Sequence, residues 1–118
     1  MGIPFVAANW KMNTSLEEAA VLVRKIVPEL QNVDGVTIVL CPPFISIPSA
    51  HELVQGTGIH LGAQNVHFED NGAFTGEISI RMVKSWCQYV IVGHSERRVH
   101  FGETDPIVNS KIRAVIRS

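Results

Sequence analysis

The sequence predicts an α/β protein built on a parallel sheet, and two observations predict it. Short apolar runs rich in β-branched residues occur four times along the 118 residues, and such runs are typical of buried strands. A segment with helical spacing or a helix-capping residue follows each run, and strands that alternate with helices build parallel sheets with right-handed crossovers. No linker or low-complexity tract interrupts this alternation, so we expect a single domain over residues 1–118.

Composition excludes several classes of function. The chain is 46% hydrophobic and 18% charged, with a formal net charge of −1, so no basic excess indicates nucleic-acid binding. Residues 1–5 lack the charged and apolar regions of a signal peptide, and no apolar run is long enough to cross a bilayer. Cys41 and Cys87 lie far apart in the sequence, without metal-ligand spacing. We therefore expect a cytoplasmic protein with buried, reduced thiols and with no metal, membrane or nucleic-acid partner.

The first strand, expected at residues 3–8, is followed by polar side chains. Alternate residues of a strand share a face, so Asn9 and Lys11 are expected to project to the same side. Lysine is rarely buried without a partner, and two interpretations of Lys11 follow. It either turns out to solvent where the loop begins, or it reaches over a site to meet an anion.

The next elements are assigned from capping, breakers and periodicity. A capping box of Ser and Glu opens a helix over residues 16–30, whose apolar residues form one stripe. Two consecutive prolines stop a strand at residues 36–41. A shorter helix is expected at residues 47–55, and a third strand at residues 59–65.

One long irregular stretch, residues 67–77, follows the third strand. Loops of this length in a compact domain usually bind something or are disordered. Phe68, Phe74 and Thr75 argue for binding, because disordered loops seldom keep aromatic residues. A third helix is expected next, at residues 79–87.

The fourth strand, residues 89–92, is followed directly by side chains that can take part in binding or catalysis. Its unbroken apolar run predicts a strand buried on both faces. Ser95 is a competent N-cap, so His94 is expected where this strand ends and a helix begins. The helix N–H groups there favour anions and disfavour a protonated imidazole, so a neutral His94 can donate a hydrogen bond to a substrate oxygen. The alternative is that His94 only caps a turn. The last segment begins with Thr104 and Asp105, and Pro106 is expected at the first position of a final helix.

Pattern alone allows two architectures for these strand–helix units. One is an open sheet with helices on both faces, and the other is part of a barrel with helices on one face. The number of units does not decide between them.

Four short motifs carry a resemblance to a known family. They stand at residues 8–13 (ANWKMN), 61–65 (LGAQN), 72–77 (GAFTGE) and 92–98 (VGHSERR). In this order and spacing they closely resemble triosephosphate isomerase. The resemblance spans the whole chain but covers only the first half of the family's (β/α)₈ barrel, which typically needs about 250 residues. It implies a parallel (βα)₄ segment of that barrel, from the first strand through the fourth helix.

The resemblance implies roles in interconverting dihydroxyacetone phosphate and glyceraldehyde 3-phosphate through an enediol(ate), without a cofactor. Asn9 and Lys11 match the family's substrate-binding Asn and Lys, whose ammonium supplies positive charge to the phosphorylated substrate. His94 matches the family's neutral electrophilic His, which polarises the substrate oxygens. Glu96 matches a Glu beside the site, an orienting partner of Lys11. The loop of Phe74, Thr75 and Gly76 matches one that inserts into a neighbouring subunit, so the resemblance also implies a homodimer.

Other parts of the family's machinery have no counterpart among these residues. The catalytic base, the lid and the phosphate cradle follow the sixth to eighth strands of the barrel. We therefore expect negligible isomerase activity from the 118 residues alone, and association with a second copy or a complementary C-terminal half. The alternative function is a non-catalytic half-barrel that serves in folding or assembly. A nucleotide-binding domain is disfavoured because a Gly-rich strand-to-helix fingerprint is absent.

Overall fold

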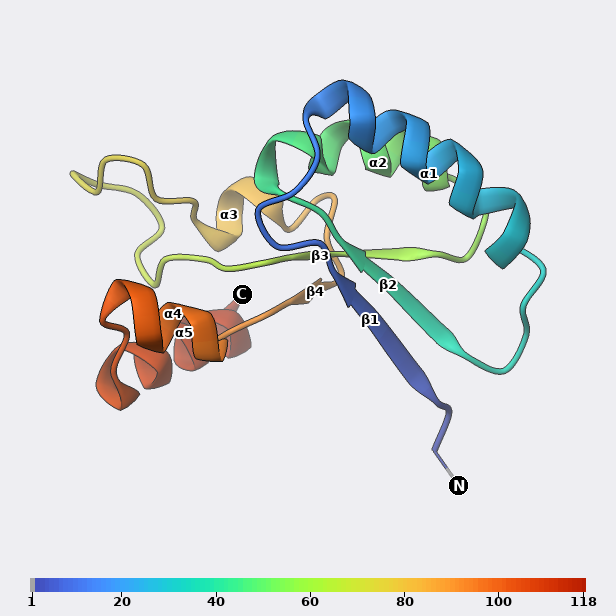
Figure 1. Cartoon of the computed structure of the whole chain (residues 1–118). Coiled ribbons are helices and arrows are strands. Elements are labelled where there is room, and N and C mark those ends of the chain that lie inside the picture. Colours follow the sequence, from blue (N-terminus) through green and yellow to red (C-terminus); the bar gives the residue numbers. More distant parts are fainter. Residues whose placement is uncertain (1) are drawn as a thin grey trace. The chain divides into compact units, whose positions relative to one another are not determined.

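The structure, a computed structural model, describes residues 2–118 and builds one four-stranded sheet within that range. The strands, in sheet order, are β1 (Phe5–Asn9), β2 (Thr37–Cys41), β3 (His60–Ala63) and β4 (Tyr89–Val90). β1 pairs with β2 and β2 pairs with β3, both in parallel. Consecutive strands that lie next to one another in parallel confirm the predicted α/β class (Figure 1).

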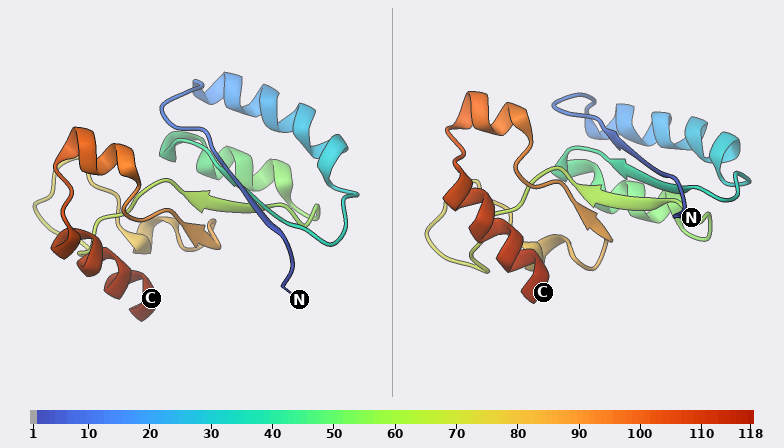
Figure 2. Two further views of the ribbon diagram at one scale, coloured as in Figure 1. Left: turned by 60° about the horizontal axis from the view of Figure 1, so that its bottom comes forward. Right: turned by 90° about the horizontal axis from the view of Figure 1, so that it is seen from below.

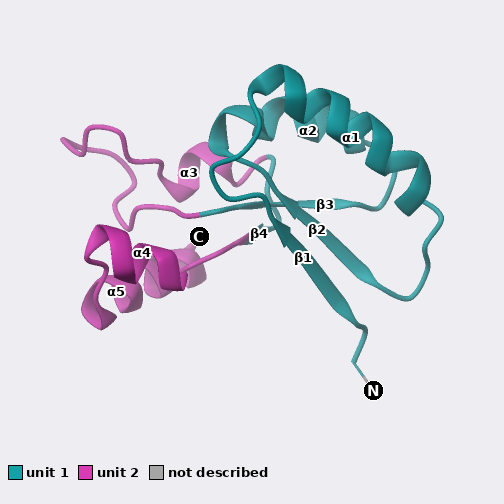
Figure 3. Cartoon of the chain, viewed as in Figure 1, with its two compact units in different colours: residues 1–64, 86–89 teal, residues 65–85, 90–118 magenta. Residues whose placement is uncertain are grey.

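Contacts divide the chain into two compact units (Figure 3). Unit 1 comprises the residues up to 64 together with residues 86–89. Unit 2 comprises residues 65–85 and 90–118. Unit 1 therefore holds most of the sheet, and unit 2 holds the long irregular stretch and the C-terminal helices.

The helices of unit 1 lie together on one side of its strands. These helices are α1 (Leu16–Leu30), α2 (Ile47–Val54) and the short 3₁₀ helix η1 (Phe44–Ser46). The predicted cap forms, because the Ser15 hydroxyl accepts a hydrogen bond from the Glu18 N–H at 3.2 Å. α1 contacts α2, and helices on opposite faces of a sheet could not touch in this way (Figures 1 and 2). Unit 1 thus has the one-sided layering of a barrel segment.

The core of unit 1 is apolar and comes from both layers. Its buried side chains include Ala19, Val23, Val39, Leu40, Ile47, Ala50, Val54 and Leu61. Burying one such aliphatic side chain contributes about 2 kcal/mol. β1 contributes little to this core, since Phe5 and Val6 are 53% and 56% exposed. The Phe5 ring instead meets the Tyr89 ring edge to face, at 5.2 Å between centroids.

Several elements differ from their predicted extents: β1 covers Phe5–Asn9 instead of residues 3–8, and β3 covers His60–Ala63 instead of residues 59–65. The helix α3 covers Ile80–Val83 and not residues 79–87. Lys84 is the C-cap of α3, and residues 84–86 form a turn that leads to Gln88, whose backbone N–H donates to Leu61 O at 3.0 Å. β4 has two residues, and Tyr89 is 39% exposed. The prediction that this strand is buried on both faces is wrong, because Tyr89 is exposed and Val90 is only partly buried.

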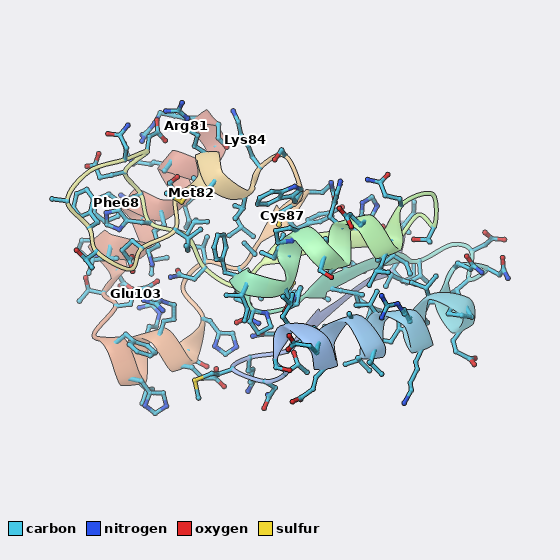
Figure 4. The ribbon with its side chains drawn as sticks, turned by 90° about the horizontal axis from the view of Figure 1, so that it is seen from above. Phe68, Arg81, Met82, Lys84, Cys87 and Glu103 are labelled. Atoms are coloured by element: carbon cyan, nitrogen blue, oxygen red, sulfur yellow. The ribbon has the colours of Figure 1, made fainter. Side chains whose placement is uncertain are left out.

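Unit 2 is organised around a buried charged cluster. Its C-terminal helices are α4 (Ser95–Phe101) and α5 (Asp105–Arg117), and Glu103, labelled in Figure 4, lies in the connection between them. Glu103 Oε2 accepts hydrogen bonds from Lys111 Nζ at 2.9 Å and from Arg97 Nε at 2.7 Å. Lys111 Nζ also donates to Asn65 Oδ1 at 2.8 Å. The side chains of Glu103 and Lys111 are only 2% and 3% exposed, so each charge depends on the other.

The electrostatics of this cluster give its stability a pH dependence. Burial alone would raise the pKa of Glu103, but the hydrogen bonds and charges of Lys111 and Arg97 outweigh it and hold this pKa below its ordinary value. A carboxyl whose pKa is lower in the folded state contributes stability that is fully present above its unfolded pKa. That contribution is lost as the pH falls through the folded pKa.

Replacing Glu103 with Gln should lower the free energy of unfolding by about 3 kcal/mol at neutral pH, because Lys111 would keep a buried charge without its counter-ion. The difference between wild type and variant should shrink as the pH falls below about 4, the ordinary pKa of a glutamate in the unfolded chain, and should disappear once the pH has fallen through the lowered pKa of the folded carboxyl. Urea unfolding at neutral and acid pH measures both effects.

Asp105→Asn is the matched control. Arg98 Nη1 donates to Asp105 Oδ1 at 2.7 Å, but the Asp105 side chain is 87% exposed. This variant should lose no more than about 1 kcal/mol. Equal losses for the two variants would show that burial does not set the strength of the Glu103 cluster.

Candidate active site

The turn after β1 places Asn9 and Lys11 in direct contact. β1 ends at Asn9, and Lys11 has a left-handed backbone with φ of 58°. The strand alternation used to predict that the two side chains project alike therefore does not extend to Lys11. The Lys11 N–H instead donates to Asn9 Oδ1 at 3.0 Å. The Asn9 side chain thus shapes the backbone of the residue expected to bind the anion.

A third strand end holds this turn in place. Gln64, directly after β3, donates from Nε2 to Lys11 O at 2.9 Å and to Cys41 O at 2.8 Å. Cys41 O also accepts the Trp10 N–H at 3.1 Å. Sequence reasoning did not single out Gln64, although it is a polar side chain at the carboxyl end of a buried strand, which is the signal that drew attention to Asn9.

His94 lies at the junction between β4 and α4, as predicted, but it has a different local role. His94 itself is the N-cap of α4, and its Nδ1 accepts the Glu96 N–H at 3.1 Å. The prediction that Ser95 is the N-cap is wrong, because Ser95 is the first helical residue. An imidazole nitrogen that accepts an N–H must carry a lone pair, so the ring proton of neutral His94 resides on Nε2.

The carboxylate of Glu96 does not compete for this nitrogen. Glu96 Oε2 lies 3.7 Å from His94 Nδ1, beyond the range of a hydrogen bond. The backbone N–H at 3.1 Å is the shorter contact and decides the tautomer. The chain reaches this junction through Gly93, whose φ is +70°, and a Cβ there would lie 2.9 Å from Val108 Cγ1. Both requirements restrict the position to glycine.

The irregular stretch of unit 2 is closed by His67 into an ordered loop. The His67 N–H donates to Ile78 O at 2.7 Å, and His67 pairs with Ser79 as an isolated parallel bridge. The His67 ring lies 4.4 Å from the rings of both Phe68 and Phe74, measured between centroids. His67 Nδ1 also lies 3.3 Å from Glu77 Oε2. His67 therefore joins the two ends of the loop to its aromatic residues.

The tip of this loop is exposed. Phe74 is 43% exposed, and Thr75 and Gly76 are exposed as well. Gly72 has φ of +137°, and a Cβ there would lie 2.8 Å from the Phe74 ring, so Gly72 allows this ring to fold back over the loop. An ordered loop with an exposed aromatic residue has the form of a protein-contact element.

The predicted site residues fall into two groups. Asn9 and Lys11 belong to unit 1, and His94 and Glu96 belong to unit 2. Asn9 contacts Lys11 within unit 1, and His94 contacts Glu96 within unit 2. In the described part of the chain, no cluster of three potential metal-ligating side chains occurs. Burial raises the pKa of both thiols, that of Cys87 to about 11, so they are protonated at neutral pH.

Comparison with known proteins decides the family. A family model described as triosephosphate isomerase matches residues 4–118. The chain belongs to the triosephosphate isomerase family. The triosephosphate isomerase of Dehalococcoides mccartyi (strain 195) is 50% identical over 113 residues, covering 96% of this chain and 45% of that protein. The one from Carboxydothermus hydrogenoformans is 51% identical over 112 residues, covering 94% and 45%.

A solved structure of the family confirms the fold. The crystal structure of triosephosphate isomerase from Bartonella henselae matches with a TM-score of 0.89 at 39% identity, covering 98% of this chain and 48% of that one. The chain thus spans about half the length of the triosephosphate isomerases that it matches. Its strands form a half-barrel, as the sequence resemblance predicted. In residues 2–118 no helix is both long and apolar enough to cross a membrane.

His67→Ala should loosen the loop of residues 67–77. The variant loses two ring contacts and the Glu77 contact, together worth about 1 kcal/mol, so the open population should rise about fivefold. Cleavage by a glutamate-specific protease after Glu69 or Glu77 should accelerate by that factor.

His51→Ala serves as the control, because His51 lies on α2 in unit 1 and contacts Gln55 at 2.8 Å. It should leave cleavage of the loop unchanged. A rate for His67→Ala equal to that of wild type would mean that His67 does not order the loop.

Proposed function

We propose that this chain supplies the N-terminal half of a triosephosphate isomerase, which interconverts dihydroxyacetone phosphate and glyceraldehyde 3-phosphate in the cytoplasm. The observation that carries the proposal is the hydrogen bond from the Glu96 N–H to His94 Nδ1 at 3.1 Å. It leaves Nε2 of a neutral imidazole as a donor. A neutral donor can polarise the substrate carbonyl and stabilise the enediolate oxygen without giving up a full proton.

Lys11 and Asn9 provide the binding half of this chemistry. The Lys11 ammonium would neutralise part of the substrate phosphate charge and of the charge that develops on the enediolate. Asn9 orders the backbone of Lys11 through its Oδ1 contact and would orient the substrate next to it. Glu96 would orient the Lys11 ammonium and would not act as the base.

The 118 residues by themselves are proposed to be inactive. Glu77, Glu96 and Glu103 match positions other than the family's base, so none of them is proposed to accept the proton from the substrate carbon. General acid–base transfer alone contributes typically about 10²–10⁴-fold. A complementary C-terminal half is the partner that would supply this group.

Exposed apolar surface supports such association. Ile3, Phe5 and Val6, at and before β1, are 69%, 53% and 56% exposed. Apolar side chains in this number beside a sheet edge favour a protein partner. The loop of Phe74, Thr75 and Gly76 would make the second contact, in a homodimer of the complete barrel. A non-catalytic assembly module remains the second candidate, since it uses the same surface.

Mixing the chain with a complementary C-terminal half distinguishes the isomerase half-barrel from the non-catalytic assembly module. The chain would be combined with the C-terminal half of the Carboxydothermus hydrogenoformans relative, and isomerisation of glyceraldehyde 3-phosphate would be measured for each half and for the mixture. We expect activity only in the mixture. A complex that forms by sedimentation but has no activity would favour the assembly module, and robust turnover by the chain alone would refute its proposed inactivity.

His94→Asn should lower kcat of the mixture by about 10²–10³-fold, the usual effect of losing one preorganised donor. His100→Asn is the matched control, because His100 is an exposed residue on the same helix, α4. It should leave kcat within about twofold of wild type. Equal rates for the two variants would remove His94 from the chemistry.

A further inference from the structure

We propose that Gln64 is a positioning residue that holds Lys11 in its left-handed backbone conformation and so aims the Lys11 side chain. The inference rests on the proposed function for the role of Lys11, but its structural part stands on contacts within unit 1 alone. Gln64 itself is proposed to touch no substrate.

The turn after β1 needs such support. Lys11 and Thr14 both have positive φ, at 58° and 72°, in a segment without glycine. A residue with a Cβ is disfavoured in this region, so it stays there only where neighbouring groups over-determine it. Within the turn, Asn13 Nδ2 donates to Trp10 O at 2.8 Å, in addition to the bond between Lys11 and Asn9. These local bonds fold the turn but do not attach the Lys11 carbonyl to the sheet.

Gln64 makes that attachment. A primary amide carries two N–H donors in one plane, and Gln64 uses Nε2 toward Lys11 O at 2.9 Å and toward Cys41 O at 2.8 Å. Cys41 O is itself fixed, because it ends β2 and accepts the Trp10 N–H. The Gln64 amide therefore fixes the Lys11 carbonyl relative to the end of the neighbouring strand, β2.

The backbone of Lys11 determines where its side chain begins. Rotation of φ from the left-handed to a right-handed region would turn the Cα–Cβ bond to another side of the chain. A long ammonium side chain can compensate only by adopting other rotamers, at an entropic cost on binding. Loss of the Gln64 donors should therefore appear in the binding of the phosphorylated substrate before it appears in the chemical step.

Two variants test the donors. Gln64→Met keeps the length of the side chain and removes both donors, and Gln64→Glu also places a carboxylate against two carbonyl oxygens. Gln55→Met is the matched control, since Gln55 Nε2 contacts His51 outside the turn. In the chain labelled with ¹³C and ¹⁵N, the Lys11 Cα shift and the one-bond Cα–Hα coupling report the left-handed conformation. We expect both Gln64 variants to lose this signature and Gln55→Met to keep it.

Kinetics of the mixture with the complementary half give the second readout. Gln64→Met should raise KM for dihydroxyacetone phosphate about tenfold and leave kcat within about threefold, whereas Gln55→Met should change neither. An unchanged Lys11 signature in Gln64→Met would overturn the positioning role whatever the chain's function is. A lost signature with an unchanged KM would leave Gln64 as a purely structural residue and would count against the binding role proposed for Lys11.

A measurement on wild type covers the case in which neither variant folds. Both Gln64 Nε2 protons are hydrogen-bonded, so they should exchange with solvent at least about tenfold more slowly than the side-chain amide protons of an exposed glutamine. Gln31, which is exposed at the end of α1, provides the reference. Equal exchange rates for the two side chains would overturn the inference.

Discussion

The carbonyl oxygen of Cys41 is the point at which three strand ends of unit 1 meet. It accepts the Trp10 N–H at 3.1 Å and a Gln64 side-chain donor at 2.8 Å, so the last residue of β2 joins the residues that directly follow β1 and β3. A parallel sheet directs the carboxyl ends of its strands to one edge, and loops there have no ladder to order them. Side-chain hydrogen bonds must supply that order. The left-handed backbone conformation that we propose Gln64 maintains at Lys11 depends on these side-chain hydrogen bonds.

Strong local signals made much of the fold predictable. α1 was predicted at its observed bounds because the Ser15 cap and a continuous apolar stripe agreed, and the start of α5 was predicted to within one residue because proline is favoured in the first turn of a helix. α3 was predicted too long, since its apolar spacing continues past Val83 while the backbone of Gln88 bonds to Leu61, 27 residues away along the chain. Sequence periodicity carries no information about such a distant partner. The cap of α4 was misassigned because serine is the usual cap, whereas His94 Nδ1 reaches the same N–H.

The candidate site was only partly visible in the sequence. Pattern left two interpretations of Lys11 and of His94 open, and only the family resemblance chose between them. His67 was missed because its importance lies in what it contacts, which spacing cannot show, whereas Gln64 was missed although it stands, like Asn9, at the carboxyl end of a strand. The Glu103 cluster left a signal that was not used: Lys111 stands four residues after Ile107 on the otherwise apolar side of α5, and a lysine in such a stripe requires a buried counter-ion.

Gln64 and Asn65 are neighbours in the chain, yet their side chains serve different clusters. Gln64 bonds to the turn of Lys11 in unit 1, and Asn65 accepts Lys111 Nζ in unit 2. Inserting or deleting one residue here would therefore remove at least one of these two side chains from its partners. The length of the chain between the end of β3 and His67 is therefore constrained by contacts of both side chains of the dipeptide.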